Sequence, residues 1–122
     1  METRRPRRVF GVGDEPDPRF TLANERTLLA WLRTALALVV AGVAIVALSE
    51  LTSPAWLVDV AASLAFLGGG LAATLGYVQW QRVERALRRH EPLPAGVGTV
   101  VVLMTIVGLA LIGAIALVGV GT

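Results

Sequence analysis

Three long segments without a charged residue dominate the hydrophobic pattern of this 122-residue chain. They cover residues 34–49, 60–81 and 92–122. About 20 apolar residues in a helix cross the hydrocarbon core of a bilayer, and runs of this length leave too little polar surface to cover a water-soluble globule. The pattern therefore predicts an all-α membrane protein with three transmembrane helices. Their expected bounds are about 18–49, 54–90 and 96–120.

Capping residues and prolines mark the ends of these helices. Asp17 followed by Pro18 is typical of a helix start, because the Asp side chain caps the first turn and proline fits its first position. Ser53 and Pro54 repeat this arrangement before the second helix, and Pro92 ends that helix.

The segment before the first helix differs in composition. Residues 1–16 combine arginines, acids, glycines and prolines without apolar periodicity, which predicts a disordered N-terminal arm. Residues 17–122 then form a single three-helix transmembrane domain.

Charge is distributed unequally between the two sides of this domain. All 11 basic residues are arginines, and they fall within residues 1–33 or 81–91. The loop over residues 49–59 contains only two charged residues, Glu50 and Asp59. Short cytoplasmic loops are enriched in Arg and Lys. We therefore expect the N-terminus and the 81–91 loop in the cytoplasm and the C-terminus outside the membrane.

Residues that most enzymes and metal sites use are scarce. Cysteine is absent, which excludes disulfides, thiolate metal sites and cysteine nucleophiles. The one histidine, His90, lies among charged loop residues, and the sequence contains no phosphate-binding loop or catalytic constellation. We expect no enzymatic activity, no cofactor, no metal and no nucleic-acid partner.

The first helix enters the membrane through an unusual sequence, LANERTLLAWLRT. It contains Asn24, Glu25, Arg26 and Arg33. At 100° per residue, Arg26 and Arg33 lie about 20° apart around the helix and about 10 Å apart along it. An arginine at the centre of a membrane helix costs about 2.5–3.5 kcal/mol. Each therefore needs a partner, which we expect to be Glu25 or Glu84, a lipid phosphate, or anions in a water-filled interior.

Two functions for these residues stay open. Rings of arginine from several copies suit an anion or phosphate pore, because guanidinium groups bind phosphate oxygens through two hydrogen bonds. Alternatively, Arg26 and Arg33 anchor the helix to anionic headgroups of the bilayer, and the chain is a non-conducting scaffold. Its basic cytoplasmic face would then recruit a soluble partner or anionic lipid. This face consists of Arg82, Arg85, Arg88 and Arg89.

Small residues at four-residue spacing predict where the second helix packs. Lipid provides no hydrophobic drive between helices, so they associate where small side chains let the backbones approach. The second helix supplies Gly68, Ala72 and Gly76. We expect these residues at a helix–helix contact, either within one chain or between subunits.

The LANERTLLAWLRT sequence, together with the preceding DPRF over residues 17–20, resembles the YidH family of small bacterial inner-membrane proteins. The domain of that family has no known function. Tyr77 followed by Arg82 and Arg85 and the three-helix plan also fit the family. The resemblance implies a location in the inner membrane and covers nearly all of the chain after the arm.

The same domain is similar to the membrane part of the eukaryotic vacuolar transporter chaperone. Several copies form a polyphosphate-conducting channel in that complex. This similarity implies that Glu25, Arg26 and Arg33 line the mouth of a pore in a homo-oligomer or in a larger membrane complex, with a polyanion as ligand. The chain differs in lacking a polymerase domain, which removes polyphosphate synthesis from the expected function.

Overall fold

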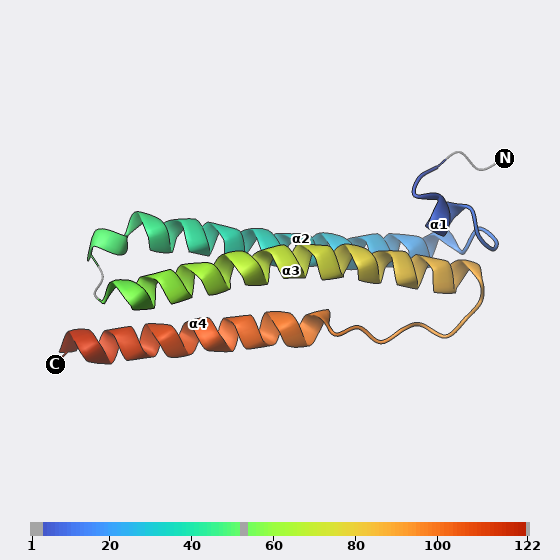
Figure 1. The fold of residues 1–122 in the computed structure, drawn as a ribbon. Coiled ribbons are helices and arrows are strands. Elements are labelled where there is room, and N and C mark those ends of the chain that lie inside the picture. Colours follow the sequence, from blue (N-terminus) through green and yellow to red (C-terminus); the bar gives the residue numbers. More distant parts are fainter. Residues whose placement is uncertain (1–3, 52–53, 122) are drawn as a thin grey trace.

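Three long helices lie side by side and make up most of the molecule (Figure 1). The computed structural model describes residues 4–51 and 54–121, with side chains as far as residue 118. In chain order the elements are α1 (Arg7–Phe10), α2 (Pro18–Ala47), the 3₁₀ helix η1 (Ser49–Leu51), α3 (Ala55–Arg88) and α4 (Gly98–Gly121). α2, α3 and α4 are each long and apolar enough to cross a membrane. The predicted all-α architecture, with three helices suited to span a bilayer, is therefore confirmed.

α2 begins as its sequence predicts. Asp17 Oδ1 accepts a hydrogen bond from the backbone N–H of Arg19 at 2.9 Å, and Pro18 occupies the first helical position. The Arg19 guanidinium also donates to the Asp17 carboxylate, with Nη2 and Oδ2 3.0 Å apart. The side-chain hydrogen bonds from Arg19, and then its backbone hydrogen bond, lower the pKa of Asp17 below its ordinary value.

α3 ends at Arg88, slightly before the predicted end of the second helix. His90 adopts a left-handed backbone conformation, with φ of 57°. This conformation lets the N–H of Glu91 reach back to the carbonyl of Ala86 at 2.9 Å, which closes the last turn of the helix. Ser53, the predicted cap at the other end of this helix, lies outside the described residues.

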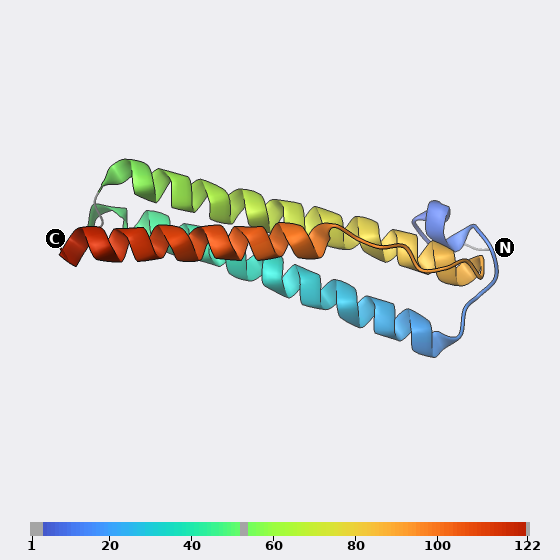
Figure 2. The same ribbon diagram turned by 90° about the horizontal axis from the view of Figure 1, so that it is seen from below.

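α3 is the central helix of the bundle, because it packs against both α2 and α4. Figure 2 shows that α2 and α3 diverge towards the end where α1 lies, while α4 covers the pair from one side. Three buried positions of α3 mediate these contacts. Gly76 lies against Trp31 of α2, Gly68 lies against Thr105 of α4, and Ala72 between them is fully buried. The structure thus places the predicted small residues at contacts within one chain.

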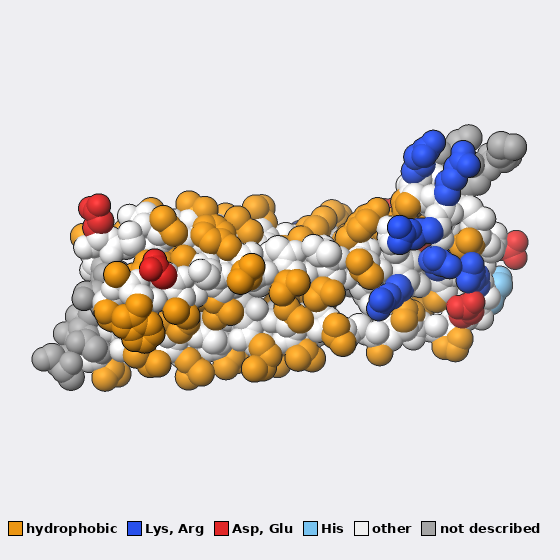
Figure 3. Space-filling view, in the orientation of Figure 1, with side chains coloured by type: hydrophobic (Ala, Val, Ile, Leu, Met, Phe, Trp, Pro, Cys, Tyr) orange, Lys and Arg blue, Asp and Glu red, His pale blue; other side chains and the backbone are white. Residues whose placement is uncertain are grey.

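The surface is apolar over most of its length and charged at its two ends (Figure 3). Large aliphatic side chains of all three long helices are exposed along the bundle, as a lipid environment requires. Arginine side chains gather at the end that carries α1, whereas Glu50 and Asp59 belong to the opposite end. The separation of charge that the sequence predicted is therefore present in three dimensions.

The N-terminal arm is not the disordered segment that its composition predicts. In its described part, residues 4–16, the chain forms α1 and folds back onto the end of α3 (Figure 1). Val9 is fully buried, and the ring of Phe10 lies 6.2 Å from that of Trp80. These two apolar side chains give the arm surface to bury, which offsets the entropy lost on ordering it.

Candidate functional site

Arg26 and Arg33 of α2 are both exposed. Among the described residues, neither guanidinium has an ion pair or a hydrogen bond. Arg26 lines a groove of about 510 Å³ between α2 and α4. The groove is mostly apolar, but Thr27 and Thr34 of α2 and Thr99 of α4 also line it. Polar groups from outside this chain can therefore reach the Arg26 side chain.

Arg33 lies deeper in the apolar part of the bundle than Arg26. Trp31 packs against Gly98, the first residue of α4, and against Gly76 of α3. Arg33 follows two residues later, so it is level with the first turn of α4, about 3 Å beyond Trp31. α4 carries no charged residue. The Arg33 side chain therefore starts inside the apolar layer and must extend to meet water, a phosphate or an acid.

Asn24 does not join Arg26 and Arg33 at this surface. Two residues correspond to a rotation of about 200° around a helix, so Asn24 faces the opposite side of α2 from Arg26. Its side-chain amide donates to the Trp80 carbonyl at 3.1 Å and to Glu84 Oε1 at 3.5 Å. The structure thus separates Asn24 from the predicted group and leaves Glu25, Arg26 and Arg33 on the exposed part of the helix.

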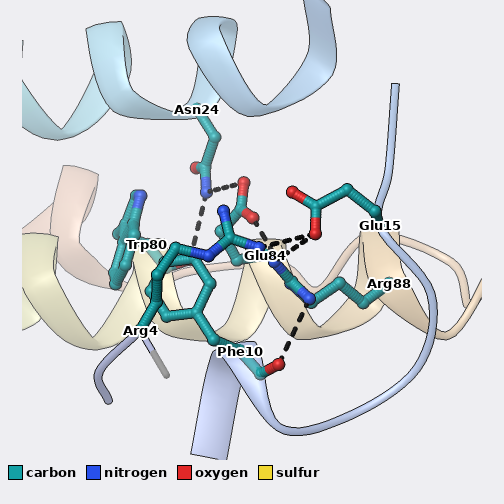
Figure 4. Close-up of polar contacts among 7 residues, drawn as sticks. All are labelled: Arg4, Phe10, Glu15, Asn24, Trp80, Glu84 and Arg88. Atoms are coloured by element: carbon teal, nitrogen blue, oxygen red, sulfur yellow. Dashed lines mark hydrogen bonds and ion pairs between the residues drawn. The ribbon is translucent and has the colours of Figure 1, made fainter. Parts of the chain in front are cut away.

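A buried polar cluster forms where α2, α3 and the N-terminal arm meet (Figure 4). α3 has 34 residues and is about 50 Å long, so its last turns extend beyond a hydrocarbon core of about 30 Å. In these turns Glu84 is 0% exposed and Arg88 only 3% exposed. Arg88 Nε and Glu84 Oε2 are 3.9 Å apart. Glu84, a predicted partner for Arg26 or Arg33, is instead paired within α3.

The prediction that Arg88 belongs to an exposed basic face is wrong. Its guanidinium turns back along α3 onto Glu84, because residues four apart share one side of a helix. The arm then covers it: Nη1 donates to the Phe10 carbonyl at 3.4 Å and Nη2 to Glu15 Oε2 at 3.3 Å. Arg82 and Arg89 remain exposed, and Arg85 is half-buried.

The arm contacts both the side chain and the backbone of Arg88. The Phe10 ring contacts two guanidinium groups, with its centroid 4.6 Å from that of Arg4 and 4.8 Å from that of Arg88. The backbone N–H of Asp14 donates to the Arg88 carbonyl at 2.9 Å. Gly13 approaches that carbonyl closely with φ of 59°, a conformation and a spacing that a residue with a Cβ would not fit.

A signal for the buried cluster is present in the sequence. The four-residue spacing of Gly68, Ala72 and Gly76 continues through Trp80, Glu84 and Arg88, and all six residues are buried. Extending this spacing by three steps would therefore have predicted that Glu84 and Arg88 are buried. No such signal marks the docking of the arm, which depends on tertiary contacts.

Comparison with known proteins relates the chain to membrane proteins of undetermined function. The family described as "Domain of unknown function (DUF202)" matches residues 19–86, which span most of α2 and α3. An uncharacterized protein of Mycobacterium tuberculosis (strain H37Rv) is 54% identical over 81 residues, which are 66% of this chain and 66% of that protein. The chain thus spans just under two thirds of the length of this relative.

Other relatives carry names that state a location in the inner membrane. The proteins named inner membrane protein YidH in Escherichia coli K12 and Shigella flexneri are each 44% identical over 88 residues, covering 71% of this chain and 76% of theirs. No solved structure matches the chain. The predicted resemblance to the YidH family is confirmed by these matches.

Proposed function

This chain belongs to the DUF202 family, and we propose that it is an oligomeric, channel-like component of the inner membrane that passes an anion or polyphosphate. Glu25, Arg26 and Arg33 would stand at its cytoplasmic mouth. The assembly would be a homo-oligomer or the membrane part of a larger complex. The proposal includes no catalytic step, cofactor or metal.

The observation that carries this proposal is that two arginines of a helix long enough to span the membrane have no acidic partner among the described residues. Arg26 and Arg33 are exposed on one side of α2 without an acidic partner among the described residues. A guanidinium at this depth requires an acid, a phosphate or water. Three helices are too few to enclose an aqueous path, so several copies would have to place their arginines around one.

The proposed orientation rests on the arginines at one end of the bundle (Figure 3). Cytoplasmic segments next to membrane helices are rich in arginine. We therefore place α1 and the 89–97 connection in the cytoplasm and η1 and the C-terminus outside. In this orientation Arg26 and Arg33 meet anions that approach from the cytoplasm.

Flux through vesicles that contain the purified protein tests the proposal. Arg33→Ala should lower the flux of chloride or short-chain polyphosphate about tenfold or more, because a charge-assisted hydrogen bond contributes about 1.5–3 kcal/mol. Arg33→Lys keeps the charge but cannot form the bidentate hydrogen bonds of a guanidinium. Its flux should therefore lie between that of Arg33→Ala and that of the unchanged protein. Arg8→Ala is the matched control, since Arg8 is exposed on α1 away from the pair. No flux in the unchanged protein, or equal flux in Arg33→Ala, would contradict the proposal.

A second candidate function, a non-conducting scaffold, is supported by the remaining basic residues of α3. Arg82, Arg85 and Arg89 line a hollow of about 280 Å³ beside the connection to α4, and one acid, Glu91, also lines it. None of these arginines has an acidic partner in the part of the chain that the structure describes. Such a surface suits an anionic lipid or an acidic soluble partner. The same vesicles separate the two functions, because a scaffold should give no flux with any variant.

A further inference from the structure

The cavity between the diverging ends of α2 and α3 is a second candidate binding site. Its volume is about 270 Å³, close to the lower end of the range for small-molecule pockets. Most of its walls are large apolar side chains from α2, α3 and the connection to α4. They include Phe20, Leu28, Trp31, Trp80, Leu87 and Leu93. Neither Arg26 nor Arg33 lines it.

Trp80, one of the residues that line this cavity, carries a buried hydrogen-bond donor without an acceptor in the described chain. Trp80 is 9% exposed, and its indole Nε1 has no hydrogen-bond partner among the described residues. In Figure 4 this nitrogen lies on the α2 side of the ring, away from Phe10. Buried donors are almost always paired in folded proteins, so an unpaired one indicates a missing acceptor.

The position of Trp80 indicates which kind of acceptor reaches it. Its ring stacks on Tyr77 at 5.8 Å, and Trp31 lines the same cavity. Tryptophan and tyrosine concentrate where a membrane protein meets the polar boundary of the bilayer. At that depth the abundant uncharged acceptors are the ester carbonyls of phospholipids. The arginines of this end favour phospholipids with anionic headgroups (Figure 3).

We propose that the cavity binds an anionic phospholipid. One acyl chain lies against the apolar walls, and its ester carbonyl accepts a hydrogen bond from Trp80 Nε1. The headgroup faces the arginine-rich end of the bundle. This site goes beyond the proposed anion path and does not depend on it, because neither Arg26 nor Arg33 lines the cavity, although Thr27 and Trp31 line both the cavity and the groove beside Arg26.

Two phosphatidylglycerols with the same chains, one ester-linked and one ether-linked, test the role of the carbonyl. Native mass spectrometry of the full chain in mild detergent counts the bound lipid. The unchanged protein should retain the ester lipid about three- to tenfold better, the range expected for one neutral hydrogen bond. Trp80→Phe should abolish this preference. Trp56→Phe should keep it, because Trp56 is an exposed tryptophan at the other end of the bundle.

A second variant keeps the test decisive if Trp80→Phe does not fold. Ala23 is exposed on α2 and lines the cavity, so Ala23→Leu should fill it and lower retention of both lipids at least threefold. Equal retention of ester and ether lipids by the unchanged protein would overturn the proposal. Displacement of bound phosphatidylglycerol by an equimolar free fatty acid would also overturn it, since the site would then select a carboxylate rather than a phospholipid. Lipid retention is measured without any flux, so the outcome of the Arg33→Ala flux experiment decides the anion path and does not bear on the lipid site.

Discussion

Replacing Glu84 with alanine is expected to lower the free energy of unfolding by about 3–5 kcal/mol. Glu84 is 0% exposed, and its carboxylate is the acidic group that faces Arg88 from within α3. Its removal leaves the guanidinium of Arg88, itself 3% exposed, beside an empty space, with Glu15 of the arm as its remaining acidic partner. Asn24 also loses an acceptor for its amide. Equilibrium unfolding in detergent micelles, followed by circular dichroism, measures this loss.

Two further variants separate the buried pair from a general effect of lost charge. Glu25→Ala removes an exposed carboxylate on α2 and should change stability by no more than about 0.5 kcal/mol. Glu84→Leu combined with Arg88→Met removes both charges, and it should recover most of the stability that Glu84→Ala loses. If Glu84→Ala is as stable as Glu25→Ala, the buried cluster does not hold the arm and the two helices together.

Gly69→Ala is expected to destabilise the protein, whereas Gly70→Ala at the neighbouring position is not. A Cβ at Gly69 would lie 2.9 Å from the backbone oxygen of Ala35 and 2.9 Å from Val39 Cγ2. The Ala35 oxygen belongs to the backbone of α2 and cannot rotate away as a side chain could. The whole of α2 must therefore shift, which costs about 1–3 kcal/mol of stability. A Cβ at Gly70 meets nothing within 4 Å, so alanine there should be neutral or stabilise by up to about 1 kcal/mol.

The two glycine variants are compared by their unfolding in the same detergent. Both carry the same chemical change in the same helix, so helix propensity cancels between them and the difference reports the α2–α3 contact. Equal stabilities would show that the close approach at Gly69 does not fix the distance between these helices.

The helix plan was predictable because its signals are local. Asp17 and Pro18 start α2, and the structure shows the predicted cap with its hydrogen bond to Arg19. The ends of the other helices fall within two residues of expectation where they are described. The uncharged length between Asp59 and Arg82 matches a hydrocarbon core of about 30 Å, so composition alone defined this span.

The site was less predictable because its contacts join distant parts of the chain. Helical periodicity placed Arg26 and Arg33 on one side of α2, and both are exposed in the structure. It does not show which side faces α3, and therefore the burial of Asn24 was missed. Arg88 looked like a surface residue because the arm that covers it joins α3 only in the folded chain.

The arginine pair connects the structure to the proposed function. Arg26 lies in the first half of α2 and Arg33 near its middle, on a bundle whose surface otherwise suits lipid. The chain itself provides them with no acidic partner among its described residues. Other copies of the chain, arranged around a shared polar path, would complete their surroundings. The proposal therefore requires an assembly.

The mass of the purified protein in mild detergent tests this requirement most directly. Native mass spectrometry or light scattering corrected for bound detergent gives the number of chains per particle. The account predicts a defined assembly of several copies that persists on dilution. A strict monomer would contradict it, because three helices cannot surround an aqueous path.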